Sequence, residues 1–348
     1  MRVMHLLASN KFSGAENVVC QIIKNVKGCD CVYVSPQGPI AERLKEEGIE
    51  FFPLEKLSAK EVKRAIKTIK PSIIHAHDFR ASVISAFVAK KIPVISHLHN
   101  NSPWLKKRGI FTFLYANSCK KYKKILTVSN SVFDEFIYGE KFKDKLLVVG
   151  NPVNITPVRH KAGDIPTDKE FEVCFLGRLT EQKQPLLFLE IIAKLKETKP
   201  QIKAIMIGDG ELREQVEQKI QELSLCDNVS LTGFLTNPYE VMKKCKILLM
   251  PSAWEGFGLA AVEAMALGMP VVCSGVGGLP LIVEEKCGKI CKNCDEYVEE
   301  VNLLLENDEY CLSKSKSALL KAVKMNNSEW YFDNVAKEYS LICEVKNG

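Results

Sequence analysis

Short apolar runs alternate with amphipathic segments along the whole chain of 348 residues. The amphipathic segments, such as Ser58–Ile69 and Ala81–Lys90, are long enough to form helices with one apolar face. This alternation is typical of βαβ units, in which helices cover a parallel sheet, and it predicts an α/β protein. The expected strands are Val3–Leu7, Cys31–Val34, Phe51–Leu54, Ile73–Ala76, Val94–Leu98, Ile125–Val128, Leu146–Val149, Glu172–Leu176, Ala204–Ile207, Val229–Leu231, Ile247–Met250 and Val271–Cys273.

Residues 150–169 divide these strands into two series. This segment contains three prolines and two glycines, which exclude a long helix and indicate a linker. A chain of this length commonly forms two domains, each with its own core. We therefore predict one α/β domain over residues 1–160 and a second over 161–327.

The composition is that of a globular protein. Hydrophobic residues make up 46% and charged residues 26% of the chain. No apolar run approaches the roughly 18 residues of a membrane-spanning helix. The N-terminus lacks the basic flank and cleavage site of a signal peptide. Thirteen cysteines without a disulfide framework indicate reduced thiols and a cytoplasmic location. An exported solute-binding protein is thereby disfavoured.

A glycine loop carries two glutamates. Glu255 and Glu263 are eight residues apart and flank the turn Gly256-Phe257-Gly258, after which Leu259 opens an apolar helix. Glycine lets backbone N–H groups approach a ligand closely, and a helix N-terminus attracts phosphate. The segment therefore predicts an anion site bordered by carboxylates that can bind sugar hydroxyls. The alternative is a buried turn in which one carboxylate caps the helix and the other is solvated.

Two cations follow the first strand of the second series. Arg178 and Lys183 lie just after Gly177, at the carboxyl end of that strand. Ligands of open α/β sheets bind at this end of the strands. A guanidinium and an ammonium both suit phosphate oxygens. The pair therefore predicts stabilisation of a diphosphate without a metal, and the chain contains no Asp-x-Asp motif.

These motifs, in this order, resemble those of the retaining glycosyltransferases of family 4, also called glycosyl transferases group 1. The hallmark of that family is a pair of glutamates separated by seven residues. The resemblance covers nearly the whole chain. It rests on Ser13-Gly14-Ala15-Glu16, Phe175-Leu176-Gly177-Arg178-Leu179 with Lys183, Ile207-Gly208-Asp209-Gly210, Val229-Ser230-Leu231-Thr232-Gly233 and the Glu255/Glu263 segment.

The resemblance implies the glycosyltransferase-B fold, two doubly wound Rossmann-like domains that face a central cleft. The second domain would bind the nucleotide-sugar donor and the first the acceptor, with a C-terminal helix over 328–348 crossing back to the first domain. Glu263 would bind the ribose, and Glu255 the donor sugar. The diphosphate would lie near Arg178 and Lys183. Further ligand contacts are implied for Gly14, Glu16, Gly177, Gly256, Phe257, Gly258 and Leu259.

Three departures from the family pattern stand out. Leu281 occupies the place of a usual glutamate, Ser13 replaces a glycine, and Gln184 follows Lys183 where a glycine is usual. Glu284 lies too far along the chain to replace the missing glutamate. These differences make the identity of the donor harder to infer than the class of reaction.

Four of the six histidines form the pairs His75/His77 and His97/His99, each at the end of an expected strand. A zinc site built from all four is one interpretation. The other, which the absence of a further ligand motif favours, is that they face the ligand cleft. By resemblance His99 positions the donor sugar, and the acceptor attacks from the side on which the diphosphate leaves. We expect no metal and no cofactor.

Cys287, Cys291 and Cys294 have a spacing also found at iron–sulfur clusters, but such triads belong to a different fold, and we expect packing cysteines.

Charge is divided unevenly along the chain. Residues 1–160 hold 26 Lys and Arg against 13 Asp and Glu, whereas the remainder holds 22 against 29. Basic residues of the first part alternate with aromatic ones, a pattern that can bind an anionic membrane. A solvated helix face is the alternative, and no module indicates nucleic acid. The residues concerned are Trp104, Lys106, Lys107, Arg108, Phe111, Phe113, Tyr115, Lys120, Lys121, Tyr122, Lys123 and Lys124.

Together with these features, the resemblance implies a retaining, metal-independent hexosyltransferase of cell-surface polysaccharide synthesis, with UDP-hexose as the expected donor. The acceptor would be a glycan or a lipid-linked sugar, and the protein would lie on the inner face of the cell membrane. An epimerase of the same fold and a non-catalytic nucleotide-sugar binding protein are the alternatives.

Overall fold

A computed structural model describes residues 1–164, 166 and 168–344. The chain forms two compact units. The first contains Met1–Pro152 and the C-terminal segment from Asn327, and the second is Val153–Asn326. The predicted second domain starts at residue 161, eight residues later than the second unit.

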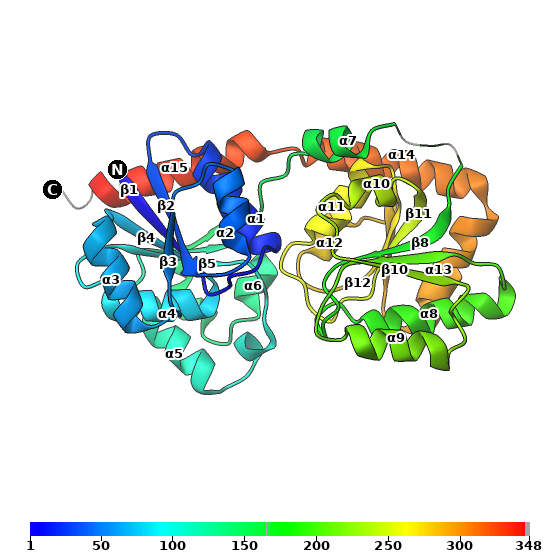
Figure 1. Cartoon of the computed structure of the whole chain (residues 1–348), viewed down its shortest axis with the longest axis horizontal. Coiled ribbons are helices and arrows are strands. Elements are labelled where there is room, and N and C mark those ends of the chain that lie inside the picture. The colour runs from blue at the N-terminus through cyan, green and yellow to red at the C-terminus, as the bar shows by residue number, and fades with distance from the viewer. Residues whose placement is uncertain (165, 167, 345–348) are drawn as a thin grey trace. The chain divides into compact units, whose positions relative to one another are not determined.

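The first unit is built on a seven-stranded parallel sheet with the strand order β3-β2-β1-β4-β5-β6-β7 (Figure 1). In the register of this sheet His5 pairs with His75, and His77 pairs with His97. The strands are β1 (Arg2–Leu6), β2 (Asp30–Pro36), β3 (Phe51–Leu54), β4 (Ile73–His77), β5 (Val94–Leu98), β6 (Lys124–Thr127) and β7 (Leu146–Val148).

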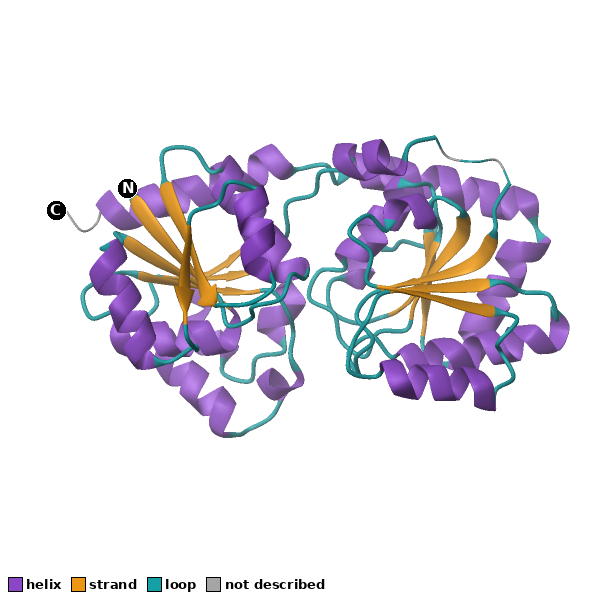
Figure 2. Cartoon of the chain, in the orientation of Figure 1, coloured by secondary structure: helices purple, strands orange, loops and turns teal. Residues whose placement is uncertain are grey.

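Helices lie on both faces of this sheet (Figure 2). They are α1 (Gly14–Asn25), α2 (Ile40–Glu46), α3 (Ala59–Ile69), α4 (Asp78–Val88), α5 (Ile110–Cys119), α6 (Asn130–Asp134) and α15 (Ser328–Glu344), with the 3₁₀ helices η1 (Pro103–Lys106) and η2 (Gly139–Lys145).

The second unit has a six-stranded parallel sheet with the strand order β10-β9-β8-β11-β12-β13. Its strands are β8 (Phe171–Leu176), β9 (Ala204–Ile207), β10 (Val229–Gly233), β11 (Cys245–Met250), β12 (Val271–Ser274) and β13 (Gly288–Cys291). Its helices are α7 (Thr156–Ala162), α8 (Pro185–Thr198), α9 (Arg213–Glu222), α10 (Tyr239–Met242), α11 (Leu259–Ala266), α12 (Leu279–Ile282), α13 (Cys294–Glu306) and α14 (Asp308–Lys324).

The predicted α/β class and the twelve predicted strands are confirmed, with ends that differ by at most two residues. The strands read as continuous apolar runs because helices cover them on both faces. In the second unit two separate hydrophobic clusters form, one containing Cys174 and Leu248 and the other Val173 and Leu249. Neighbouring residues of one strand enter different clusters because side chains alternate between the faces of a sheet.

Two segments were not fully anticipated. Strand β13 was absent from the predicted strands, because its residues Gly288–Cys291 include a glycine and a lysine and only one branched apolar residue. Helix α7 lies within the predicted linker, where Pro157 is tolerated because it occupies the first turn. Among the helices of the described residues, none is long and apolar enough to cross a membrane.

The predicted C-terminal helix is present as α15 and belongs to the first unit. It buries Tyr331 and Tyr339, and the Tyr339 hydroxyl is 2.6 Å from Nδ1 of His75 on β4. The last four residues of the predicted segment 328–348 lie outside the described residues.

Candidate functional site

The glutamate loop of the second unit follows β11 and ends where α11 begins. Its Gly258 has a φ of 102°, a conformation that residues with a Cβ avoid. A second glycine loop, after β12, presses against it. A Cβ on Gly277 would lie 1.5 Å from the carbonyl oxygen of Glu255, and one on Gly278 would lie 2.7 Å from that of Phe257. Glycine at these positions therefore sets the path of the glutamate loop.

Glu255 is held by a cation from a different loop. Lys183 Nζ lies 2.5 Å from Glu255 Oε2, and the two side chains are only 15% and 11% exposed. Ser252 Oγ donates a further hydrogen bond of 3.3 Å to the same carboxylate oxygen. The backbones of the two loops also bond, since Ala253 N donates to Gln182 O at 2.8 Å. Lys183 and Glu255 thus meet because β8 and β11 are neighbours in the sheet.

Arg178 lies on the same β8–α8 loop and is exposed. Its side chain makes no hydrogen bond or ion pair with the other residues that the structure describes. The backbone beneath it is tightly packed, because Leu179 N donates to Asp209 O at 3.0 Å and a Cβ on Gly208 would lie 1.9 Å from Gly177 O. A rigid loop therefore carries a guanidinium whose donors are available to an anion.

Glu263 lies on α11 and is bonded by a residue that the sequence analysis missed. The Tyr239 hydroxyl donates to Glu263 Oε1 at 3.0 Å. Burial raises the pKa of Glu263 to about 7, although the Tyr239 hydrogen bond and the charge of Lys183 act in the opposite direction. Since Lys183 influences this carboxyl and binds the other one, the two predicted glutamates belong to one site.

We expect the buried carboxyl of Glu263 to make stability depend on pH. Between about pH 4.5 and 7 the folded chain retains a proton at Glu263 that the unfolded chain releases, so the free energy of unfolding falls as the pH rises. Glu263→Gln should remove this loss and stabilise the protein by about 3 kcal/mol at pH 8, with little effect at pH 4.5. Thermal unfolding of the wild-type protein and Glu263→Gln between pH 4.5 and 8 measures this difference in stability. The exposed Glu240→Gln is the control, and a Glu263→Gln effect independent of pH would contradict the assignment.

The first unit contributes a second group of candidate residues. Glu16, in the first turn of α1, is 5% exposed and accepts a hydrogen bond from the Ser13 hydroxyl. Burial raises the pKa of Glu16 above its ordinary value, and the charge of Asp78 adds to this effect. Nothing lies within 4 Å of the position that a Cβ would take on Gly14. The start of α1 is therefore open beside a carboxylate that is itself buried.

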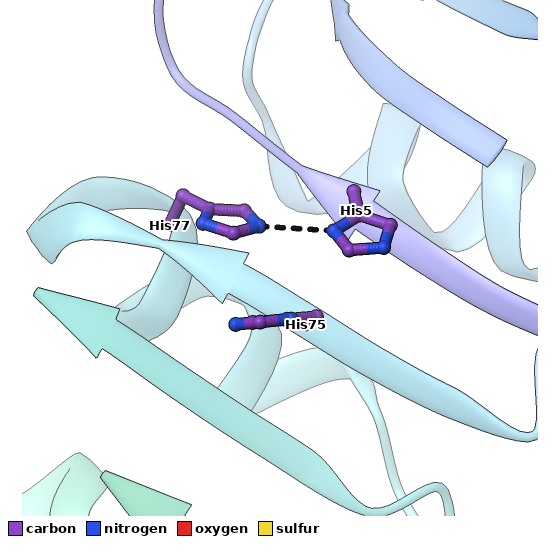
Figure 3. Close-up of side chains that lie close together, drawn as sticks. All are labelled: His5, His75 and His77. Carbon is purple, nitrogen blue, oxygen red and sulfur yellow. Dashed lines mark hydrogen bonds between the residues drawn. The ribbon is translucent and has the colours of Figure 1, made fainter. Parts of the chain in front are cut away.

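Five histidines from β1, β4 and the end of β5 form two hydrogen-bonded rows. In the first row His5 Nδ1 is 3.1 Å from His77 Nε2, and His77 Nδ1 is 2.9 Å from His99 Nε2. In the second, His75 Nε2 is 3.2 Å from His97 Nδ1. The rows stack on each other, with ring centroids 4.3 Å apart for His75 and His77 and 4.1 Å apart for His97 and His99. Figure 3 shows the start of this arrangement around His5, which the sequence analysis did not single out.

Burial makes all five imidazoles neutral. It lowers the pKa of His5 to about 3 and that of His99 to about 4, and it lowers the pKa of the other three well below the ordinary value. Ring nitrogens of two triplets, His5/His75/His77 and His77/His97/His99, lie within 4.8 Å of one another and could approach a metal ion. However, the lone pairs of an imidazole lie in the ring plane, and stacked rings keep them in separate planes. This geometry favours hydrogen-bonded imidazoles over metal ligands.

The cysteine triad does not form a common site. Cys287 packs into one hydrophobic cluster of the second unit and Cys291 into the other. Burial raises the pKa of both thiols, that of Cys291 to about 12. A raised pKa disfavours the thiolate form that an iron–sulfur cluster requires. These contacts match the expected packing role.

The structure also describes the position where the family glutamate is missing. Leu281 is 63% exposed on α12. Glu284 forms an ion pair with Lys321 of α14, which lowers the pKa of Glu284. Glu284 is thus engaged elsewhere, in line with the expectation that it does not replace the missing carboxylate.

Two family profiles match most of the chain. The profile of the family "Glycosyl transferases group 1" matches residues 159–320, and that of "Glycosyltransferase Family 4" matches residues 12–156. An uncharacterized glycosyltransferase of Methanocaldococcus jannaschii is 28% identical over 60% of this chain and 57% of its own length. A Campylobacter jejuni α-1,4-N-acetyl-D-galactosaminyltransferase, named for an undecaprenyl-diphosphate-linked acceptor, is 26% identical over 76% of this chain and 72% of its own.

Solved structures agree on the fold. The Anabaena protein HepE, crystallised in complex with UDP and glucose, superposes with a TM-score of 0.86 at 22% identity, covering 98% of this chain and 99% of its own. A sucrose-phosphate synthase of Thermosynechococcus elongatus superposes with a TM-score of 0.78 at 15% identity, covering 99% of each chain. The two Rossmann-like units thus have the glycosyltransferase-B fold, and the chain belongs to the group 1, family 4 glycosyltransferases.

Proposed function

We propose that this glycosyltransferase moves a hexose from a UDP-sugar to a glycan or lipid-linked acceptor, with retention of configuration and without a metal ion. The observation that carries the proposal is the joint position of Arg178, Lys183 and Glu255 at the carboxyl edge of one sheet. A cation pair beside a carboxylate fits the two halves of such a donor, a diphosphate and a sugar with free hydroxyls.

In the proposed reaction the bond between the anomeric carbon and the diphosphate breaks as negative charge grows on the leaving oxygen. Arg178 and Lys183 stabilise that charge, because preorganised cations act where charge develops. Glu255 accepts hydrogen bonds from the sugar, and Glu263 from the ribose. The acceptor hydroxyl attacks from the side of departure, and its proton passes to the leaving phosphate. His99, Glu16 and Gly14 of the first unit act on the sugar and the diphosphate as positioning groups.

The names of two relatives support the proposed substrates. The Campylobacter jejuni relative is named for an acceptor linked to undecaprenyl diphosphate, and an Escherichia coli relative, 25% identical over 64% of this chain, is named a UDP-Gal:α-D-GlcNAc-diphosphoundecaprenol α-1,3-galactosyltransferase. We therefore propose an acceptor of this kind, and a role in the synthesis of a cell-surface polysaccharide.

Transfer should occur in the presence of a chelator. Radiolabelled UDP-hexoses incubated with undecaprenyl-diphosphate-linked sugars and EDTA should give a labelled, lipid-extractable product, in which NMR coupling constants show the anomeric configuration of the donor. Fixed cations supply the charge that a metal would otherwise supply. Activity lost in EDTA and restored by Mg²⁺ or Mn²⁺ would contradict the metal-independent mechanism. An epimerised UDP-sugar without transfer would instead identify an epimerase.

We also propose that the first unit binds an anionic membrane. The surface concerned, called here the α4–α5 surface, combines large exposed apolar side chains with basic ones. Lys121 Nζ lies 4.9 Å from the ring centroid of Phe87, which joins the two kinds of side chain. The α4–α5 surface consists of Phe87 (60% exposed), Ile110 (69%), Phe111 (56%) and Phe113 (60%), with the exposed Lys107, Arg108, Lys120 and Lys121.

The structure corrects the membership expected from sequence. Tyr115 and Tyr122 are fully buried and belong to the core. Lys106 forms an ion pair with Glu135, and Lys124 one with Glu338. Aromatic spacing alone does not separate core from surface, because α5 is apolar on both of its faces.

Vesicle binding tests this surface. Replacing Lys107, Arg108, Lys120 and Lys121 with Gln should lower partitioning onto phosphatidylglycerol vesicles at least about tenfold at low salt, since each basic residue contributes about 1 kcal/mol. The matched control removes four lysines from α3 and its C-terminus, Lys60, Lys63, Lys67 and Lys70. Equal binding of the wild-type protein to anionic and neutral vesicles in a sedimentation assay would refute membrane docking.

A further inference from the structure

The row His5–His77–His99 connects the interior of the first unit to its candidate site. His5 and His77 are 0% and 1% exposed, whereas His99 is partly exposed. At that end the His99 backbone N–H donates to Asp78 Oδ1 at 2.9 Å, and the charge of Glu16 influences the pKa of His99. The row therefore begins among buried side chains and ends beside two carboxyl groups.

Hydrogen bonding couples the tautomers of the three rings. A neutral imidazole has one N–H donor and one acceptor nitrogen. If His5 Nδ1 donates to His77 Nε2, His77 must donate from Nδ1 to His99 Nε2, and His99 then carries its proton on Nδ1. If the direction is reversed, the unpaired proton lies on His5 Nε2. Both terminal nitrogens, His5 Nε2 and His99 Nδ1, are buried without a partner in the described structure.

The surroundings of the two ends favour one direction. A buried N–H without an acceptor is costly, and burial alone shifts the pKa of His5, with no charged group contributing. In the opposite direction the unpaired N–H is the one on His99 Nδ1. This N–H lies in the negative field of Asp78 and Glu16, which stabilises the positive end of its dipole.

We propose that His5 and His77 are positioning residues that hold His99 as the neutral Nδ1–H tautomer, in which its one unprotonated nitrogen, Nε2, is occupied by the hydrogen bond from His77. The imidazole then orients the sugar and does not remove a proton from it. This role in catalysis rests on the proposed sugar transfer, whereas the tautomer itself is a property of the free protein.

Nitrogen NMR of the ¹⁵N-histidine-labelled protein tests the tautomer without any substrate. At pH 7 we expect His99 Nδ1 at a protonated, pyrrole-type shift and Nε2 at an unprotonated, pyridine-type shift, with His160 of α7 as a reference outside the rows. His5→Leu should abolish the preference and bring the two His99 nitrogens towards averaged shifts. His5→Asn should restore it, because the Asn amide can donate from the position of Nδ1.

The matched control is His97→Leu. His97 stacks on His99 at 4.1 Å but belongs to the other row, so this change removes packing without removing the hydrogen bonds of His99. It should leave the His99 assignment unchanged. A protonated Nε2 on His99 in the wild-type protein, or the same shift change in His97→Leu and His5→Leu, would overturn the proposal. So would a stoichiometric metal ion in the purified protein with metal-type nitrogen shifts.

Once transfer has been established, kcat provides the second measurement. His5→Leu should lower kcat about tenfold with little change in KM, and His5→Asn should recover most of it. If the tautomer is confirmed but no donor supports transfer, the proposed function fails while the hydrogen-bonded row stands. If transfer is found and His5→Leu leaves kcat unchanged, the positioning role is excluded.

Discussion

Lys183→Ala should lower kcat/KM for sugar transfer at least about 100-fold, because it removes a cation preorganised for the leaving diphosphate. It also leaves Glu255 without the partner that now lies 2.5 Å away in a mostly buried position. Arg178→Ala should have an effect of similar size without a change in thermal stability, since Arg178 is exposed and makes no ion pair with the described residues. Steady-state kinetics with the radiolabelled donor measure both changes.

Helix α8, which follows Lys183, offers a control for the loss of a positive charge. Lys194 on α8 forms an exposed ion pair of 2.7 Å with Asp295, and such pairs contribute little to stability. Lys194→Ala should therefore leave kcat/KM within about twofold of the wild-type value. Arg178→Lys should recover only part of the activity lost in Arg178→Ala, because an ammonium lacks the planar fork that binds two phosphate oxygens. Full activity in Lys183→Ala and Arg178→Ala would contradict the proposed diphosphate site.

Gly277→Ala should lower kcat/KM by about 100-fold or more, although residue 277 need not touch the substrate. The new Cβ would lie 1.5 Å from the carbonyl oxygen of Glu255, so the glutamate loop must move. A displacement of about 1 Å in a positioned group can cost about 100-fold in rate. The melting temperature should also fall, because φ is +59° at this position.

Gly268→Ala separates the two causes. Its φ is +74°, so alanine meets a similar backbone strain, but nothing lies within 4 Å of the added Cβ. It should destabilise the protein by about 1–2 kcal/mol and leave kcat/KM close to the wild-type value. If Gly277→Ala and Gly268→Ala lose activity to the same extent, backbone strain in the second unit explains the loss, and displacement of the Glu255 loop does not.

The strands and the two α/β units could be predicted from sequence because their signal is local. A strand buried on both faces is mostly apolar, and nearly every run ends at a glycine, proline or polar residue. The loop before α11 could be predicted in the same way, since Gly258 has a φ of 102°, which residues with a Cβ avoid.

Partners that come from distant segments could not be predicted in the same way. Tyr239 is 24 residues from Glu263, and His5 is 72 residues from His77. Only the order of strands in the sheet brings such residues together, and periodicity within one strand carries no information about that order. The single histidine that interrupts the apolar strand β1 was the one available signal for His5.

Helix α15 makes the first unit discontinuous along the chain, whereas the second is one unbroken segment, Val153–Asn326. During synthesis from the N-terminus, the second unit has all of its residues before the first does. Until residues 328–344 emerge from the ribosome, the strands of the first unit lack the helix that brings Tyr339 to His75. We therefore expect the nascent chain to hold a finished second unit while the first unit is incomplete, with His75 and its neighbours exposed to chaperones.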